Sequence, residues 1–264
     1  MSLSLVVFAS CSDDDKDSPS SENGENGSNS GNGNVSAVSV FKSGTQDGHD
    51  YVDLGLTSGT QWATANVGAS KAQDYGNYYA WGEVTTKEVY NWKTYKYGTY
   101  NYDKDYSNLI KYNLSDNKTT LDPADDAAHV NWGGKWVVPA DKDFEELLAE
   151  CYWQWTDNYN NSNVEGYIVY KAKSSSDKGV KIYEYETPSS SYKLSDAHIF
   201  LPAAGYCERG VLISNGSGGY YWSSSLDTGN PSCAWFVSFN SGSMYDFYAS
   251  RYFGHSVRAV IPGE

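Results

Sequence analysis

Residues 219–262 have the sequence GYYWSSSLDTGNPSCAWFVSFNSGSMYDFYASRYFGHSVRAVIP, and this stretch decides how the chain folds. Three of its runs place apolar residues at every second position, the period that buries one face of a β-sheet. The runs are 220–222, then Trp235, Val237 and Phe239, then Val257, Ala259 and Ile261. We therefore predict that these positions build a sheet and that Trp235 belongs to its core.

Between the last two runs, residues 240–255 have the composition of a binding surface. They are rich in Tyr, Phe, Ser, Asn and Gly, and no Lys follows Lys193. Tyr offers a large contact area with few torsions to freeze, while Ser, Asn and Gly supply adaptable hydrogen bonds. A Tyr-rich loop that only covers the core is the alternative. The candidate ligand-binding residues are Phe236, Ser238, Asn240, Tyr245, Asp246, Phe247, Tyr248, Ser250, Tyr252, Phe253 and His255.

Composition limits the class of protein and the kind of partner. The chain has 264 residues, of which 39% are apolar and 16% aromatic, enough for a sizeable core in one or two domains. A net charge of −14 argues against nucleic acid, because phosphate binding depends on clustered Lys and Arg. We therefore expect a protein or glycan partner.

The cysteines and histidines indicate no metal site. Cys11, Cys151, Cys207 and Cys233 form no disulfide pattern that can be assigned from spacing alone. Neither a Cys-x-x-Cys nor a His-x-x-x-His pair occurs, so the sequence does not predict a zinc site. We predict no metal and no cofactor.

The first residues resemble the end of a bacterial lipoprotein signal. Residues 1–11 are an apolar run that ends in Phe-Ala-Ser-Cys, which resembles a lipobox with Cys11 as the lipid-attachment residue. An acidic run at 13–15 resembles the export tag of surface lipoproteins in Gram-negative bacteria. An ordinary secretory peptide is the alternative. The lipobox predicts a protein on the outer membrane, exposed at the cell surface, that contacts the membrane only through its N-terminal lipid.

Two further regions follow the signal. Residues 12–36 contain only Ser, Asp, Asn, Gly, Glu, Lys and Pro until Val35, so they cannot bury enough apolar surface to fold. We predict a disordered acidic tether there and a single ligand-binding domain over 37–264.

Within this domain the sequence predicts two hairpins, a long loop and two helices. Alternating residues predict one hairpin over 50–67, with Trp62 in the core, and another over 167–183. Residues 75–113 have no clear period and predict loop. Around Pro123, Asp122 is expected to cap a helix, and a calcium site of Asp122, Asp125 and Asp126 is the alternative. Apolar residues spaced as in a helix predict a second helix over 141–151 that buries Cys151.

The chain resembles the Fibrobacter-type major paralogous domain in a series of short motifs. They occur in order over about residues 38–262, and their joint order and spacing carry the resemblance. The motifs are 51–56 (YVDLGL), 62–64 (WAT), 74–76 (DYG), 79–83 (YAWGE), 125–128 (DDAA), 131–134 (NWGG), 200–205 (FLPAAG), 219–225 (GYYWSSS) and 256–258 (SVR).

This resemblance implies a C-type-lectin-like fold related to the formylglycine-generating enzyme. Such a domain is of the α+β class, with two helices and small twisted antiparallel sheets. Some domains of this kind are variable proteins of diversity-generating retroelements, and their binding residues correspond to 234–258 here. The resemblance therefore implies a variable-type binding segment where composition also indicates a binding surface.

Together these features predict a lipid-anchored surface protein for binding or adhesion that recognises a protein or glycan on another cell or host. A structural subunit of a surface or fimbria-like assembly is the alternative. An enzyme of the formylglycine-generating type is the weakest hypothesis, because it needs a pair of reactive cysteines and Cys207 and Cys233 are isolated. We predict no catalytic residues, and the sequence leaves the oligomeric state open.

Overall fold

The computed structural model describes residues 41–101 and 106–263, so the predicted signal, the tether and Cys11 lie outside the described part. Of the described residues, 34% are in strands and 12% in helices. The predicted α+β class is therefore wrong, and the fold is mainly β. Many segments without a clean sequence period form short strands, because their hydrogen-bond partners come from distant parts of the chain.

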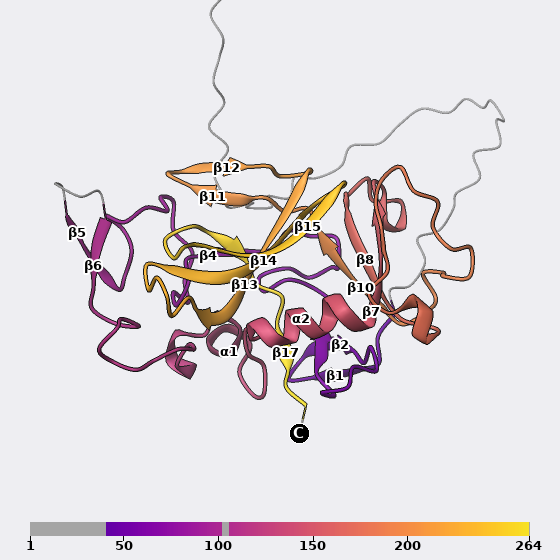
Figure 1. The fold of residues 1–264 in the computed structure, drawn as a ribbon, viewed down its shortest axis with the longest axis horizontal. Coiled ribbons are helices and arrows are strands. Elements are labelled where there is room, and N and C mark those ends of the chain that lie inside the picture. Colours follow the sequence, from indigo (N-terminus) through magenta and orange to yellow (C-terminus); the bar gives the residue numbers. More distant parts are fainter. Residues whose placement is uncertain (1–40, 102–105, 264) are drawn as a thin grey trace, which may run out of the picture.

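The described strands form three larger sheets and two small hairpins (Figure 1). The first sheet has the order β1 (Gly44–Gln46), β2 (His49–Val52), β3 (Gln61–Ala63) and β17 (Val260–Ile261). The second has the order β10 (His198–Pro202), β8 (Gly166–Lys171), β7 (Cys151–Thr156) and β9 (Lys181–Ile182). The third has the order β15 (Ser243–Ser250), β14 (Cys233–Asn240), β13 (Gly218–Leu226), β16 (His255–Ser256) and β4 (Tyr78–Tyr79). The hairpins are β5 (Gly98–Asn101) with β6 (Tyr106–Leu109) and β11 (Tyr206–Glu208) with β12 (Val211–Ile213).

The described helices are short. The α-helices are α1 (Ala127–Trp132) and α2 (Asp141–Glu150), and the 3-10 turns are η1 (Pro123–Asp125), η2 (Tyr159–Asn161) and η3 (Ser175–Asp177). No helix in the described ranges is long and apolar enough to cross a bilayer. Helix α2 lies against β13 and β14, so it covers one face of the third sheet.

The structure confirms the first predicted hairpin and overturns the second. Strands β2 and β3 pair antiparallel, with Val52 opposite Trp62, and Trp62 is completely buried. By contrast β8 pairs with β7 and β10, whereas β9 runs parallel to β7. The run at 151–156 supplies the missing strand, and its nearly continuous burial hides the alternation that would have predicted it. Within the predicted loop 75–113, β4, β5 and β6 form as well.

The acidic segment around Pro123 is structural. Asp122 precedes η1, but its side chain makes no capping bond, whereas Asp126 caps α1 by accepting a hydrogen bond from the His129 amide. Asp125 accepts hydrogen bonds from the ammonium groups of Lys96 and Lys111. Because lysine cations occupy its oxygens, the calcium alternative is not supported.

The predicted helix over 141–151 is α2, and its first turn is fixed by Asp143, whose carboxylate accepts a hydrogen bond from the Ala140 amide at 2.7 Å. Phe144 and Leu147 are completely buried in the main core, as helical spacing predicts. Cys151 is buried too, and burial raises the pKa of its thiol to about 12. The predicted burial is confirmed, and such a thiol is inert.

Candidate functional site

The predicted binding residues divide between the two faces of the β14–β15 hairpin. Residues directly opposite each other on paired strands share a face, and the register places Phe236 opposite Phe247 and Val237 opposite Asp246. One face carries Phe236, Ser238, Asn240, Tyr245 and Phe247. The other face, which is turned toward α2, carries Asp246, Tyr248 and Ser250. The structure therefore does not bring all eleven candidates onto one surface.

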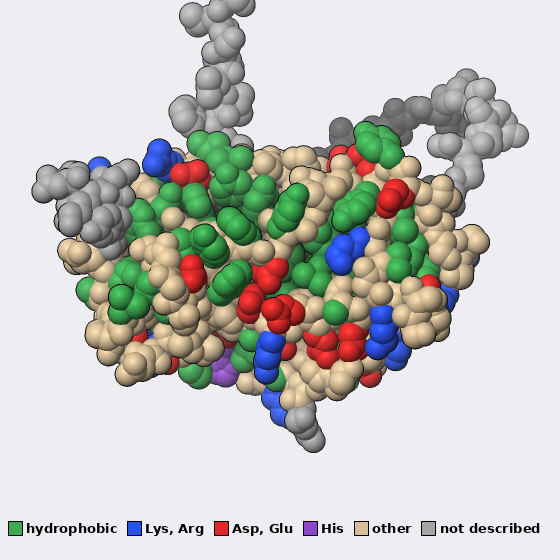
Figure 2. Space-filling model, in the orientation of Figure 1, with side chains coloured by type: hydrophobic (Ala, Val, Ile, Leu, Met, Phe, Trp, Pro, Cys, Tyr) green, Lys and Arg blue, Asp and Glu red, His purple; other side chains and the backbone are tan. Residues whose placement is uncertain are grey.

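The most exposed of these side chains are aromatic and lie on β15. Tyr245 is 62% exposed, Phe247 54% and Tyr248 42%. The rings of Phe247 and Tyr248 stack with their centroids 4.7 Å apart, although the two residues start on opposite faces. Among the described strands, β15 pairs with β14 alone and is therefore the edge of the third sheet. Green hydrophobic side chains cover much of this part of the surface in Figure 2.

Three candidates that the sequence assigned to the binding surface are buried. Phe236 is 7% exposed, Tyr252 8% and His255 2%. The prediction that Phe236 belongs to an exposed binding surface is wrong, because a second layer covers the part of its face around Phe236. Tyr206 of β11 lies in that layer and contacts the rings of Tyr220, Phe253 and His255.

His255 belongs to an aromatic cluster inside this layer. Its ring stacks on Trp222 at 4.0 Å, and its Nδ1 makes no hydrogen bond to any described residue. Burial lowers the pKa of His255 to about 3, so the imidazole is neutral. We assign this histidine to packing.

The smaller polar candidates serve the hairpin itself. The Asn240 amide oxygen accepts hydrogen bonds from the Gly242 amide and the Ser243 hydroxyl, both at 2.9 Å. The Ser250 carbonyl accepts a hydrogen bond from the Phe253 amide at 3.1 Å, and Ser238 is half-buried. These contacts shape the surface that carries the exposed rings.

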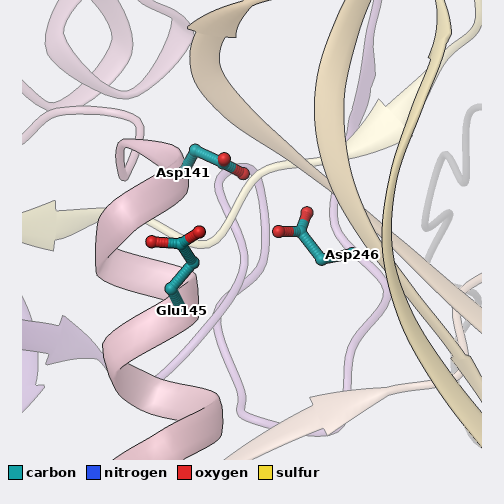
Figure 3. A group of neighbouring side chains, drawn as sticks. All are labelled: Asp141, Glu145 and Asp246. Atoms are coloured by element: carbon teal, nitrogen blue, oxygen red, sulfur yellow. The ribbon is translucent and has the colours of Figure 1, made fainter.

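An acidic cluster lies between β15 and α2. Asp141 and Glu145 project from the start of the helix, Asp246 projects from β15, and the three carboxylates point toward one another (Figure 3). One carboxylate oxygen from each residue lies within 4.8 Å of the others. Asp141 Oδ1 and Asp246 Oδ1 are buried without a hydrogen-bond partner, and no Lys or Arg in the described ranges forms an ion pair with any of the three.

The cluster has the chemistry of a cation site. Burial, and then the negative charge of Asp141, raises the pKa of Asp246 to about 7. A bound cation would relieve this repulsion, and a hard divalent ion accepts carboxylate oxygens together with water. The sequence prediction of no metal stays a prediction.

Sequence reasoning missed three residues beside the exposed rings. Trp235 was predicted to be core, but it is only half-buried, and its ring meets that of Tyr248 edge-on at 5.8 Å. Asp141 is the first residue of the predicted helix, where the macrodipole favours an acidic side chain, so its identity alone indicates no site. Glu145 follows one turn later on the same side of the helix. The spacing of two acidic residues four positions apart was the sequence signal that could have indicated an acidic cluster. Nothing in the sequence of α2 indicates that Asp246 of β15 lies beside these two residues.

Comparisons with protein-family models, curated proteins and solved structures find no match to this chain. The described cysteines offer no accessible nucleophile, because Cys151, Cys207 and Cys233 are all buried.

The acidic cluster predicts an unusual pH dependence of stability. The folded-state pKa of Asp246 lies above the ordinary value of 3.8, so the wild type should lose stability as pH rises from about 4 through about 7. Asp246→Asn should remove this loss and raise the free energy of unfolding at about pH 8 by about 1–2 kcal/mol, since solvent screens a half-buried group. Urea unfolding at about pH 4, 6 and 8 measures the effect. The exposed Asp157→Asn variant is the control, and an equal change in both variants would contradict the prediction.

Proposed function

We propose that this chain is a cell-surface binding protein whose edge strand β15 recognises a protein or glycan on another cell or host surface. The observation that carries the proposal is the exposure of Tyr245, Phe247 and Tyr248 together on this strand. Exposed aromatic side chains that gather on one element are typical of interaction sites, and Tyr is enriched among residues that dominate binding energy.

Two features of the sequence support the surface location. The lipobox-like end of residues 1–11 would attach the chain to a membrane, and the polar segment 12–36 would hold the domain away from it. The ordered motifs shared with the Fibrobacter-type major paralogous domain support a binding role, since some members bind through the segment that corresponds to 234–258. We therefore propose that the exposed rings of β15, with Trp235 beside them, make the contacts. The sheet that carries these rings would be supported by the buried side chains of Phe236, Tyr252 and His255.

The test compares the wild type with a Tyr245→Ala/Phe247→Ala double variant on a glycan array and in pull-downs from host-cell surface proteins. Both residues lie on the outer face of the hairpin and contribute little to the core, so the variant should fold normally. We expect at least about a tenfold loss of affinity for the ligand found, because two contact rings are removed. Leu114→Ala removes a side chain that is 81% exposed elsewhere and should leave affinity unchanged. Equal binding by wild type and double variant would rule out this surface.

The edge position of β15 also favours a second candidate function, a structural subunit that assembles through this strand. Unpaired edge strands are templates for pairing between chains. Self-association at micromolar concentration, lost in the same double variant and seen by sedimentation velocity, would support assembly. The net charge of −14 opposes it, because like-charged copies repel at low salt.

A further inference from the structure

We propose that the outer edge of β15 binds an extended peptide segment of the partner, and that a Lys or Arg of this segment enters the carboxylate cluster of Asp141, Glu145 and Asp246. This inference rests on the proposed function, since it takes β15 as the binding strand. It adds the chemistry of the partner, a basic peptide in strand conformation.

The backbone of β15 offers the first part of the site. The turn of Ser241 and Gly242 joins Asn240 directly to its partner Ser243, so this pair must exchange backbone hydrogen bonds. Hydrogen-bonded and non-bonded pairs alternate along an antiparallel ladder, and the register runs without a bulge to the end of β15. The N–H and C=O groups of residues 244, 246 and 248 therefore point away from β14. No backbone hydrogen bond in the described ranges reaches these groups.

A strand added at this edge would bring one side chain to the acidic cluster. In an antiparallel pair, the residue opposite Asp246 places its side chain on the same face, with the Cβ atoms about 4.5–5.5 Å apart. That face is turned toward α2, where Asp141 and Glu145 converge on Asp246 (Figure 3). A Lys or Arg at the opposite position can thus reach all three carboxylates.

The charges favour a basic side chain over any other. The cluster holds three acidic groups without a cationic partner among the described residues, and two of their oxygens are buried without a hydrogen bond. An ammonium or guanidinium group supplies several N–H donors and the opposite charge. In Figure 2, acidic side chains gather near the middle of the surface, between the region of β13–β15 and α2, and hydrophobic side chains border them.

The aromatic residues complete the site. Tyr248 and Trp235 start on the same face as Asp246, so their rings can cover the aliphatic stem of the basic side chain and attract its charge. Tyr245 and Phe247 lie on the opposite face, where the alternate side chains of the peptide would point. Backbone pairing would give affinity, and the basic residue would give specificity.

Fluorescence anisotropy with synthetic peptides and the full chain tests the proposal. The probe is an end-blocked peptide of about seven residues, alternating threonine and valine, with lysine at its centre. One matched peptide carries glutamine instead of lysine. Two further peptides keep the lysine and carry N-methyl groups on every second backbone nitrogen. The methyl groups are on the odd-numbered nitrogens in one peptide and on the even-numbered nitrogens in the other, so only one of the two loses the N–H groups that would face β15. We expect the lysine peptide to bind about tenfold more tightly than the glutamine peptide at low salt, and one N-methylated peptide alone to lose binding.

Variants locate the site. Asp141→Asn/Asp246→Asn should reduce the lysine preference to about twofold or less while binding of the glutamine peptide persists, because only the charges are removed. Asp157→Asn should keep the full preference.

Other outcomes overturn the inference. These are equal affinity for the lysine and glutamine peptides, equal tolerance of both N-methylated peptides, or a second copy of the chain that holds the edge and excludes the peptide. If a glycan or protein found in the first test still depends on Tyr245 and Phe247, the proposed function stands while this inference fails.

Discussion

Replacing Arg258 by Ala is expected to lower the free energy of unfolding by about 4 kcal/mol, the largest effect we predict. Arg258 lies in the short segment between β16 and β17, and its side chain is completely buried. Its Nη1 donates a hydrogen bond to the Ala63 carbonyl at 3.0 Å, and its Nη2 donates one to the Phe200 carbonyl at 2.8 Å. Nε donates a third to Asn66 Oδ1 at 2.9 Å. Because Ala63 belongs to the first sheet and Phe200 to the second, one guanidinium joins two sheets to the C-terminal segment.

The loss should be large because two backbone carbonyls and the Asn66 side chain would lose the donor that Arg258 supplies. Removing one partner leaves buried carbonyl groups without hydrogen bonds, and the truncation leaves a cavity as well. Burial also lowers the pKa of Arg258 to about 10.

Urea unfolding of the wild type, Arg258→Ala and Arg258→Lys measures the effect. Lysine keeps the charge but lacks the planar fork, so it should recover only part of the stability. Arg209→Ala is the matched control, since the Arg209 side chain is 69% exposed, and it should change stability by less than about 0.5 kcal/mol. A loss of under about 1 kcal/mol in Arg258→Ala would show that the three hydrogen bonds do not hold the sheets together.

Parts of the fold that are determined locally could be predicted from the sequence. The helix α2 follows from the spacing of Phe144 and Leu147, and the scaffold of β13 and β14 follows from alternation around Val237. These predictions depend only on the period of helix or strand.

The parts that depend on contacts between distant segments could not be predicted. Burial of Tyr252 and His255 depends on Tyr206 and Glu208 of β11, and nothing in the sequence near residue 252 indicates these contacts. The acidic cluster joins residues of α2 to Asp246, about a hundred positions later in the chain. Composition correctly predicted that the side chains of Tyr245, Phe247 and Tyr248 are exposed. It could not predict which of them lie on which face of β15.

Asp125→Asn is expected to lower the free energy of unfolding by about 2 kcal/mol near neutral pH and to remove much of the acid sensitivity of the protein. The Asp125 carboxylate is buried at 3% exposure. Its Oδ2 accepts hydrogen bonds from Lys111 and from the Tyr112 hydroxyl, the latter at 2.7 Å. Its Oδ1 accepts hydrogen bonds from Tyr97 and Lys96. Burial alone would raise the pKa, but these four donors outweigh it and lower the pKa of Asp125 to about 2.

The sign of the pH dependence follows from this shift and is opposite to that of Asp246. Because the folded-state pKa of Asp125 lies below the ordinary 3.8, its contribution is complete above about pH 4 and is lost as pH falls toward 2. Thermal unfolding between about pH 2 and 7 should therefore show wild type and Asp125→Asn converging at low pH, whereas the exposed control Asp157→Asn follows the wild type throughout. The prediction would be contradicted by a difference in unfolding temperature between wild type and Asp125→Asn that stays constant down to pH 2. Such a result would mean that the substitution only disturbs packing, and that the ionised carboxylate does not stabilise the segment around Pro123.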